Sequence, residues 1–442
     1  MKMIAAAATA LLALAAPLHA QVAAEPVAQR IQADMPGLLA IYRDLHANPE
    51  LSFQELRTAR IMADAARQAG FAVTEKVGRT GVVAVLRNGA GPTVLIRTDM
   101  DALPVTEQTG LPFASKARGL SRAGVESGIM HACAHDTHMT AWIETARLLA
   151  TRRGAWSGTL VMIAQPAEEI GEGARAMLAD GLYTRFPKPD YVLAFHNSAD
   201  LAAGVLGTTR GFAMANVDSV DVLVRGVGGH GAAPQTTKDP IVLASAIVMR
   251  LQTLVSRDQN PVDPAVVTVG SFQGGTTHNI IPAEVALQLT VRSYSDRTRT
   301  RLLDGIRRIA SGEAIASGIA ESAMPVVTVK PGYTRATWNT PDFTGRMTTL
   351  LRGHFGAARV VDLPPAMVGE DFGEYGRAAP DHIASLIFRV GGVPADRIAA
   401  AEREGRELPS LHSPTYAPQA DAVIAAAAEA LTVSAMDLLR RD

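Results

Sequence analysis

The sequence predicts an α/β protein with a mostly parallel sheet in a larger domain and a ferredoxin-like α+β domain inserted into it. Nearly continuous apolar segments at 81–86, 93–97, 158–164 and 191–195 alternate with helical patterns, which is typical of buried parallel strands. From about residue 212 the order changes to β-α-β-β-α-β, the ferredoxin-like arrangement. A chain of 442 residues also exceeds one compact core, which favours two domains.

The N-terminal segment resembles a secretory signal peptide. Lys2 precedes an apolar segment, and small and apolar residues lead up to Gln21. We therefore expect export to the periplasm or the medium, with no membrane segment after the signal is removed. The predicted boundaries are residues 1–20 for the signal peptide, 21–211 with 332–442 for the larger domain, and 212–331 for the inserted domain.

The helices of the larger domain follow from periodicity and end signals. A helical pattern over 26–47 stops before Asn48 and Pro49. Ser52 is the expected N-cap of the next helix, with Glu55 as its capping-box partner, because that spacing satisfies two backbone donors. Further helices are expected over 134–153 and from about 419.

The inserted domain has a regular alternation of elements. A strand around Val220, Val222 and Val224 shows the period-two pattern of a half-buried sheet. The remaining elements are expected as a helix over 239–257, strands over 266–272 and 284–294, a helix over 296–316 and a strand over 325–329.

Composition and motifs exclude several classes of function. The chain has 42 basic and 43 acidic residues and a net charge of -1, so it has no basic surface expected to bind nucleic acid or membrane. Gly226-Val-Gly-Gly-His-Gly231 formally matches a dinucleotide fingerprint, but no helix pattern follows directly, and we reject that site. The nucleophile elbow of a serine hydrolase and the Walker loop are also absent from the sequence.

A metal site is indicated by the segment Ile129–His138, which holds three histidines and the only cysteine. Thiolate and imidazole ligands suit zinc and its first-row neighbours. Ligand-type residues at expected strand ends and loops complete the set: Cys133, His135, Glu169, His196 and His412. Five ligands exceed the need of one tetrahedral ion, so we expect two divalent metal ions; zinc, manganese, cobalt and nickel are all compatible.

Glu168 is the expected general base. It directly precedes Glu169, after a buried strand and Pro166, so a free carboxylate would stand beside a ligating one. The alternative is a solvated surface acid, and the neighbouring metal ligands favour the catalytic interpretation.

Several other polar residues have open alternatives. Asp99 and Asp101 orient a ligating histidine or cap a strand end. His131 and His138 are expected in supporting or core positions rather than as ligands. In the inserted domain, the candidates for substrate contact are His230 as a polar tip, with Asn279 and Arg292 against a carboxylate, although a surface salt bridge is the alternative for Arg292.

Six motifs together resemble the aminoacylase and carboxypeptidase family of dinuclear metallopeptidases, peptidase family M20, and within it the amidohydrolase subfamily of N-acyl-amino-acid and hippurate hydrolases. They run in order through nearly the whole mature chain: Leu45-His-Ala-Asn-Pro-Glu-Leu-Ser-Phe53, Asp99-Met-Asp-Ala-Leu-Pro104, His131-Ala-Cys-Ala-His-Asp136, Pro166-Ala-Glu-Glu169, Gly229-His-Gly-Ala-Ala-Pro234 and Gly369-Glu-Asp-Phe372.

The resemblance implies a catalytic larger domain that holds two metals at the five ligands, with Glu168 as base. It implies that the inserted domain is a lid that forms a homodimer, in which His230 and Asn279 reach the partner's site and His230 polarises the scissile carbonyl. Arg292 would contact the substrate carboxylate. The family usually has glycine where Ala134 and Thr137 stand; a positive φ at Ala134 would cost about 1 kcal/mol or more.

The expected function is hydrolysis of the amide bond of a small N-acyl or N-aminoacyl amino acid. A dipeptidase or carboxypeptidase acting on short peptides is the alternative among enzymes. An exported binding protein without turnover is the alternative from another class, and the intact Glu168 beside a full ligand set argues against it.

Overall fold

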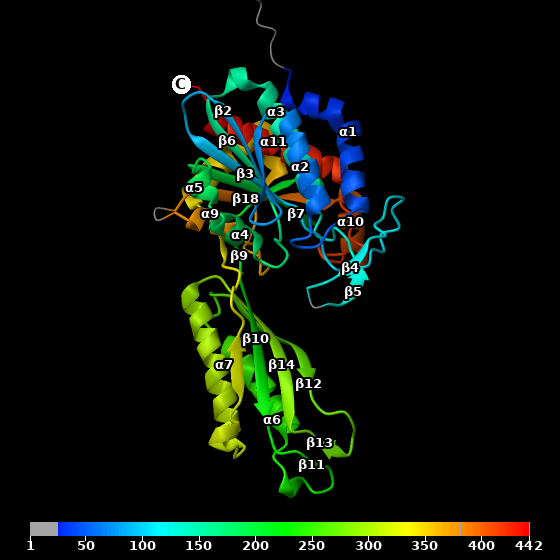
Figure 1. Ribbon diagram of the computed structural model, residues 1–442, viewed down its shortest axis with the longest axis vertical. Coiled ribbons are helices and arrows are strands. Elements are labelled where there is room, and N and C mark those ends of the chain that lie inside the picture. The colour runs from blue at the N-terminus through cyan, green and yellow to red at the C-terminus, as the bar shows by residue number, and fades with distance from the viewer. Residues whose placement is uncertain (1–24, 123, 380–381, 442) are drawn as a thin grey trace, which may run out of the picture.

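The computed structural model describes residues 25–122, 124–379 and 382–441. Figure 1 shows a larger α/β domain from which the inserted domain projects along the long axis of the molecule. This arrangement confirms the predicted fold class.

The larger domain is built on an eight-stranded sheet in the order β1-β2-β6-β3-β7-β18-β8-β17. Its middle strands β6, β3, β7 and β18 are parallel to one another, and β8 is parallel to β17. The pairings β1–β2, β2–β6 and β8–β18 are antiparallel. The strands are β1 (Ala72–Val77), β2 (Gly81–Asn88), β3 (Thr93–Asp99), β6 (Gly158–Gln165), β7 (Tyr191–Ala202), β8 (Leu206–Thr208), β17 (Val360–Asp362) and β18 (Ala384–Val393).

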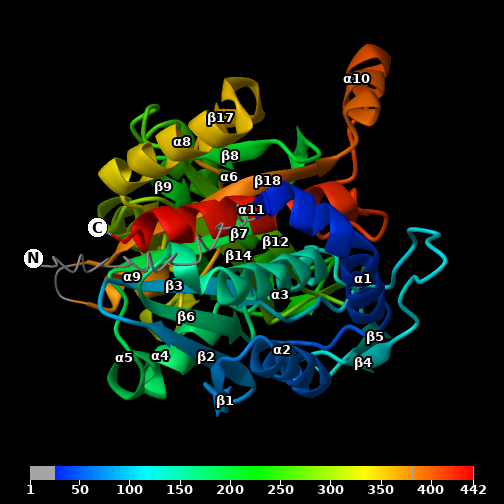
Figure 2. The same cartoon turned by 90° about the horizontal axis from the view of Figure 1, so that it is seen from above.

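Helices cover both faces of this sheet (Figure 2), and each strand of the middle contributes alternate side chains to the two sides. On β3, Val94 and Ile96 pack into one core and Leu95 into the other. The helices of the larger domain are α1 (Val27–Ala47), α2 (Leu56–Gln68), α3 (His135–Thr151), α4 (Gly173–Ala179), α5 (Leu182–Arg185), α8 (Pro341–Phe355), α9 (Gly373–Arg377), α10 (Ala395–Glu404) and α11 (Ala420–Leu438).

The inserted domain has an antiparallel sheet in the order β12-β14-β10-β15, which is the ferredoxin-like order, with α6 and α7 packed on it. Asp239 caps α6 by accepting hydrogen bonds from two backbone N–H groups, and Pro240 occupies the first turn. The elements are β10 (Asn216–Arg225), α6 (Pro240–Ser256), β12 (Ala265–Gln273), β14 (Glu284–Ser293), α7 (Asp296–Ala316) and β15 (Val326–Val329).

The chain leaves the larger domain through β9 (Gly211–Met214) and returns through β16 (Thr337–Asn339), and these two strands pair antiparallel. The remaining short elements are β4 (Arg118–Leu120), β5 (Glu126–Gly128), β11 (Gly229–His230), β13 (Ile280–Ile281) and four 3-10 helices at Arg153–Ala155, Pro234–Thr236, Glu321–Ala323 and Ala357–Arg359.

The capping prediction for α2 is wrong. Glu55 stands at the N-cap and makes no capping bond there. The Ser52 hydroxyl instead donates to Asp101 Oδ2 at 2.6 Å, and Glu55 Oε1 accepts from the backbone N–H of Ala167 at 2.9 Å. Both residues satisfy buried groups of distant loops, and these tertiary bonds outweigh the local capping pattern.

Within the described part of the chain, no helix is both long enough and apolar enough to cross a bilayer. The predicted signal peptide, residues 1–20, lies outside the described residues.

Candidate metal centre and active site

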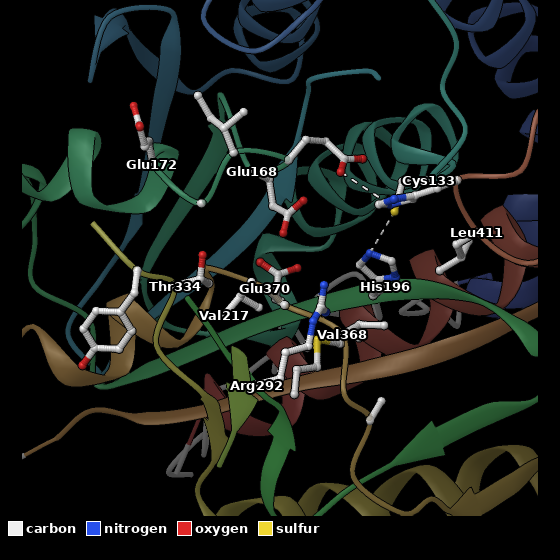
Figure 3. Close-up of a pocket in the computed structure, with 18 of the residues that line it drawn as sticks. Cys133, Glu168, Glu172, His196, Val217, Arg292, Thr334, Val368, Glu370 and Leu411 are labelled. Atoms are coloured by element: carbon white, nitrogen blue, oxygen red, sulfur yellow. Dashed lines mark hydrogen bonds and ion pairs between the residues drawn. The ribbon is translucent and has the colours of Figure 1, made fainter. Parts of the chain in front are cut away.

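The five candidate ligands come from four separate segments and meet at one place. Figure 3 shows two of them, Cys133 and His196. Cys133 lies in the turn before α3, and its Sγ is 3.5 Å from Nε2 of His196 on β7. Nε2 of His412 is 3.4 Å from one oxygen of Glu169, and Nε2 of His135 is 3.8 Å from the other. The donor atoms form two overlapping groups, Cys133-His135-His196 and Cys133-Glu169-His412, each within 4.8 Å. Two overlapping groups fit two neighbouring cations better than one.

Unsatisfied buried atoms show that this donor set fits a metal. His135 Nε2 and Glu169 Oε1 are buried and have no hydrogen-bond partner among the described residues. A buried polar atom without a partner is costly, and a cation would satisfy both atoms. In the protein alone, burial raises the pKa of the Cys133 thiol, and burial raises the pKa of Glu169 to about 8. A bound cation would favour the ionised, ligating forms of both groups.

Two of the candidate ligand histidines are oriented by backbone carbonyls. Nδ1 of His135 lies 2.7 Å from the carbonyl oxygen of Asp101, and Nδ1 of His196 lies 2.7 Å from that of Asn197. Because a carbonyl only accepts, Nδ1 of each ring must carry the proton, which leaves the Nε2 lone pairs for metal.

Asp101 positions the Glu168-Glu169 turn. Its two carboxylate oxygens accept from the backbone N–H groups of Glu168 and Glu169, each at 3.0 Å. Ala167, just before this turn, has a φ of 50°. The carboxylate therefore holds both glutamates in place through their backbone N–H groups.

His138 lies next to the candidate ligands, and both of its ring nitrogens bond to other groups of the larger domain. Its Nδ1 bonds to Asp99 at 2.7 Å, and its Nε2 accepts from the backbone N–H of Asn197 at 2.9 Å. Both ring nitrogens are thus occupied, so His138 links the end of β3 to β7 next to His196. His131 is also buried, and neither ring nitrogen has a hydrogen-bond partner among the described residues.

Ala134 has a left-handed backbone conformation, which fits the glycine that the family usually has at this position. Its φ is 63° and its ψ is 32°. The Thr137 hydroxyl donates to the Ala134 carbonyl at 2.7 Å and closes this turn at the start of α3. This conformation lets Cys133 and His135 face the same point, although only Ala134 separates them.

Glu168 lies at the edge of the metal ligands. Its Oε2 is 3.9 Å from Nε2 of His135, and the residue also lines the main cavity. Burial, followed by repulsion from Glu370 and Glu169, raises the pKa of Glu168 well above its usual range. It is thus a carboxyl group with a raised proton affinity, close to the candidate ligands, and its side chain has no hydrogen-bond partner among the described residues.

Sequence reasoning missed the role of Arg97 and Glu370. Arg97 is fully buried on β3 and donates to Asp99 at 2.7 Å and to Glu370 at 2.8 Å. Glu370 lies beside Glu168, within the group of Glu168, Glu370 and Asp371. An arginine inside an otherwise apolar strand was the available signal, because a buried arginine needs carboxylate partners.

The main cavity measures about 930 Å³ and lies where the larger and inserted domains meet. Arg292 reaches it from β14, and its Nη1 donates to the Met367 carbonyl at 2.7 Å. In Figure 3 the Arg292 side chain points toward the space between Glu370 and His196. A second cavity of about 690 Å³ shares Arg122, Glu169, Ile170 and Glu172 with the first, and its lining includes the apolar residues Leu51, Phe53, Leu103 and Pro104.

His230 and Asn279 lie elsewhere in the single chain. They belong to the β11–β13 region at the far end of the inserted domain (Figure 1), where the Gly231 N–H donates to the Asn279 carbonyl at 2.8 Å. Neither residue lines the two cavities described above. Their predicted contact with a partner's active site stays a prediction.

Comparison with known proteins agrees with this geometry. The model of peptidase family M20/M25/M40 matches residues 95–413. The chain is 37% identical to a hippurate hydrolase of Campylobacter jejuni, over 75% of this chain and 83% of the relative. It is 35% identical to an N-acetyl-L-cysteine deacetylase of Bacillus subtilis, over 78% of this chain and 79% of the relative.

A solved structure shares the whole architecture. The YXEP protein of Bacillus subtilis, described as a dinuclear metal-binding peptidase of the M20 family, aligns with a TM-score of 0.73 and 29% identity. The alignment covers 92% of this chain and 99% of that one. The match over most of the chain, together with a clustered set of metal-type ligands, shows that this protein is a hydrolase of peptidase family M20.

Proposed function

We propose that the protein hydrolyses the amide bond of N-acyl amino acids, with Glu168 as general base. The observation that carries the proposal is the position of Glu168, a buried carboxylate beside the ligand cluster and open to a cavity of about 930 Å³. The named activities of the relatives, a hippurate hydrolase and an N-acetyl-L-cysteine deacetylase, support a substrate of this class.

Cys133, His135, Glu169, His196 and His412 would hold two divalent ions of the zinc, manganese, cobalt or nickel type. When bound, such ions supply positive charge that lowers the pKa of a nearby water and polarises the scissile carbonyl.

Glu168 moves the proton in both halves of the reaction. Its carboxylate accepts a proton from the attacking water as the new C–O bond forms. It then donates that proton to the amide nitrogen as the C–N bond breaks, which releases a carboxylic acid and a free amino acid. Asp101 fixes the position of Glu168 for this proton transfer, because its carboxylate accepts a hydrogen bond from the Glu168 backbone N–H at 3.0 Å.

The substrate carboxylate is assigned to Arg292. A guanidinium group suits a carboxylate because two N–H donors match its two oxygens. Only Nη1 of Arg292 has a hydrogen-bond acceptor within the described residues, the Met367 carbonyl. The other guanidinium donors are therefore available in the cavity.

We also propose that the protein forms a homodimer and is exported. In the dimer, His230 and Asn279 at the tip of the inserted domain would enter the partner's active site, where His230 would polarise the carbonyl oxygen. The signal-like residues 1–20 support export to the periplasm or the medium.

Substitution of Glu168 by glutamine tests the proposal. The amide keeps the size of the side chain but cannot accept a proton, so kcat should fall about 10²–10⁴-fold. The bound metal, measured by elemental analysis, should stay at the wild-type level because Glu168 is not a ligand. Glu172→Gln is the matched control, since Glu172 is a nearby acid paired with Arg122 at 2.5 Å.

Unchanged turnover in Glu168→Gln would refute the base assignment. Loss of metal together with turnover would show instead that Glu168 is a ligand. A wild-type protein that binds substrate and metal without turnover would favour the binding-protein alternative.

A further inference from the structure

Arg389 is a half-buried cation that lines the main cavity and that the proposed mechanism does not use. It lies on β18, directly opposite His196 on the parallel neighbour β7. Opposed residues of parallel strands face the same side of a sheet, so Arg389 points to the side that carries His196. It lines the same cavity as Glu168 and Arg292. Arg389 therefore lies one strand away from a metal ligand, at the substrate side of the site.

The guanidinium group of Arg389 has no hydrogen-bond or ion-pair partner among the described residues. Its Nη2 is buried and has no hydrogen-bond acceptor among the described residues. The charged and titratable groups that act on it are Asp200, also in the cavity lining, and Tyr294, and neither forms a hydrogen bond or ion pair with it in the described chain. A buried guanidinium nitrogen without an acceptor is costly, which suggests that a ligand supplies the acceptor.

Two other cations in the cavity lining, unlike Arg389, each have a carboxylate partner. Arg122 pairs with Glu172 at 2.5 Å, and Lys330 pairs with Asp221 at 3.2 Å. Arg292 has only a carbonyl acceptor. The cavity thus presents two guanidinium groups, Arg292 and Arg389, that have no carboxylate of their own.

Arg292 lies near the C-terminal end of β14. Tyr294 follows Arg292 by two residues, and it is close enough to Arg389 for that charge to lower its pKa, although burial is the larger influence and raises it. Figure 3 shows the Arg292 side chain directed toward the space between Glu370 and His196. A substrate whose amide lies at Glu168 would therefore place its α-carboxylate at Arg292 and its side chain toward Arg389.

We infer that the preferred substrate releases an amino acid with a carboxylate side chain, of the glutamate or aspartate type, and that Arg389 binds that second carboxylate. This inference rests on the proposed function. An apolar side chain in the same place would exclude water from Arg389 without offering an acceptor, whereas a carboxylate accepts two N–H donors.

The test compares N-acetyl-L-glutamate with N-acetyl-L-glutamine, which has nearly the same shape but no side-chain charge. The metal-loaded wild-type protein should show a kcat/KM at least about tenfold higher for the glutamate derivative, because a lost charge-assisted bond costs at least that factor. Arg389→Gln should abolish this ratio, mainly by raising KM for the glutamate derivative, while the glutamine derivative is cleaved at nearly the wild-type rate. Arg389→Lys should restore part of the ratio.

Arg122→Gln is the matched control, because Arg122 lines the same cavity but already has a carboxylate partner. It should keep the wild-type ratio of the two substrates. Calorimetric binding of N-acetyl-L-glutamate to Glu168→Gln, with and without Arg389→Gln, gives a readout without turnover, and the added substitution should weaken binding about tenfold or more.

Equal kcat/KM for the two substrates in the wild-type protein would overturn the inference and leave the proposed function intact. The inference would also be overturned if Arg389→Gln lowered kcat/KM for both substrates by one common factor, which is the result expected of a purely structural residue. If the metal-loaded protein cleaves no N-acyl amino acid at all, the proposed function fails and this inference fails with it.

Discussion

Single residues set the geometry of the site, and Ala134 shows how. Its left-handed backbone, with φ of 63°, turns Cys133 and His135 toward one point at the start of α3. Alanine at such a φ costs about 1–2 kcal/mol relative to glycine. Its methyl group is buried against Ala199 and Tyr416, and burial of one methyl group offsets about 0.8 kcal/mol of that cost.

The buried methyl group offsets part of the backbone cost, so Ala134→Gly should raise the free energy of unfolding by at most about 1 kcal/mol. Ala134→Val should be at least about 1 kcal/mol less stable than the wild type, because a β-branched side chain strongly disfavours positive φ. Chemical denaturation of the three proteins measures both values. A valine variant as stable as the wild type would show that the turn does not need this backbone conformation.

Elements are joined to the site by buried polar bonds, and His46 on α1 is the clearest case. Its Nδ1 bonds to Asp136 in the first turn of α3 at 2.6 Å, and its Nε2 bonds to Glu107 at 3.0 Å. Burial alone would lower the pKa of His46, but the bonds to Asp136 and Glu107 outweigh it and raise the pKa to about 10. His46 is therefore a buried cation that ties α1 to the helix whose first turn carries His135.

A raised pKa in the folded state gives the sign of the pH dependence. The stabilisation by His46 is fully present below its unfolded pKa of about 6.5 and is lost as the pH rises through about 10. The difference in unfolding free energy between the wild type and His46→Gln should therefore be largest at pH 6 and shrink toward pH 10. Denaturation of both proteins at several pH values measures it, and a difference that grows with pH would contradict this assignment.

The sequence predicts the helices, the strands and the types of ligand better than it predicts buried polar bonds between distant segments. Periodicity and strand-end positions are local, so they indicated the parallel strands, the ferredoxin-like order and the five candidate ligands that the structure brings together. The bond between Arg97 and Glu370 joins residues 273 positions apart, and the Ser52 bond to Asp101 joins residues 49 apart. Such pairs depend on which segments meet in space, which one sequence does not reveal.

Arg389 was missed for the same reason. In the sequence it is one polar residue in an apolar strand. Only the pairing of β18 with β7 places it beside a metal-type ligand.

At the scale of the whole molecule, the inserted domain places His230 and Asn279 far from the cavities of their own chain (Figure 1). This distance is compatible with the proposed homodimer, in which each chain completes the other's site. A twofold dimer makes the exchange reciprocal, so two different defects in the two chains leave one site intact.

Coexpression of Glu168→Gln with His230→Ala should therefore restore activity that neither variant shows alone. In a mixed dimer, the chain with intact Glu168 receives an intact His230 from its partner. Random pairing should give about a quarter of the wild-type activity, since half the dimers are mixed and each has one working site. Coexpressing two tagged copies of the same variant is the control, and no restored activity in verified mixed dimers would contradict the shared site.

The central claim is that the clustered ligands hold metal ions for amide hydrolysis, and metal removal tests it most directly. The purified protein would be treated with a chelator, supplied with zinc, manganese, cobalt or nickel, and assayed on a panel of N-acyl amino acids and dipeptides. We expect chelation to abolish release of the free amino acid and at least one metal to restore it, with about two ions bound per chain. Hydrolysis that persists in the verified metal-free protein, or no hydrolysis with any metal at full occupancy, would contradict the claim.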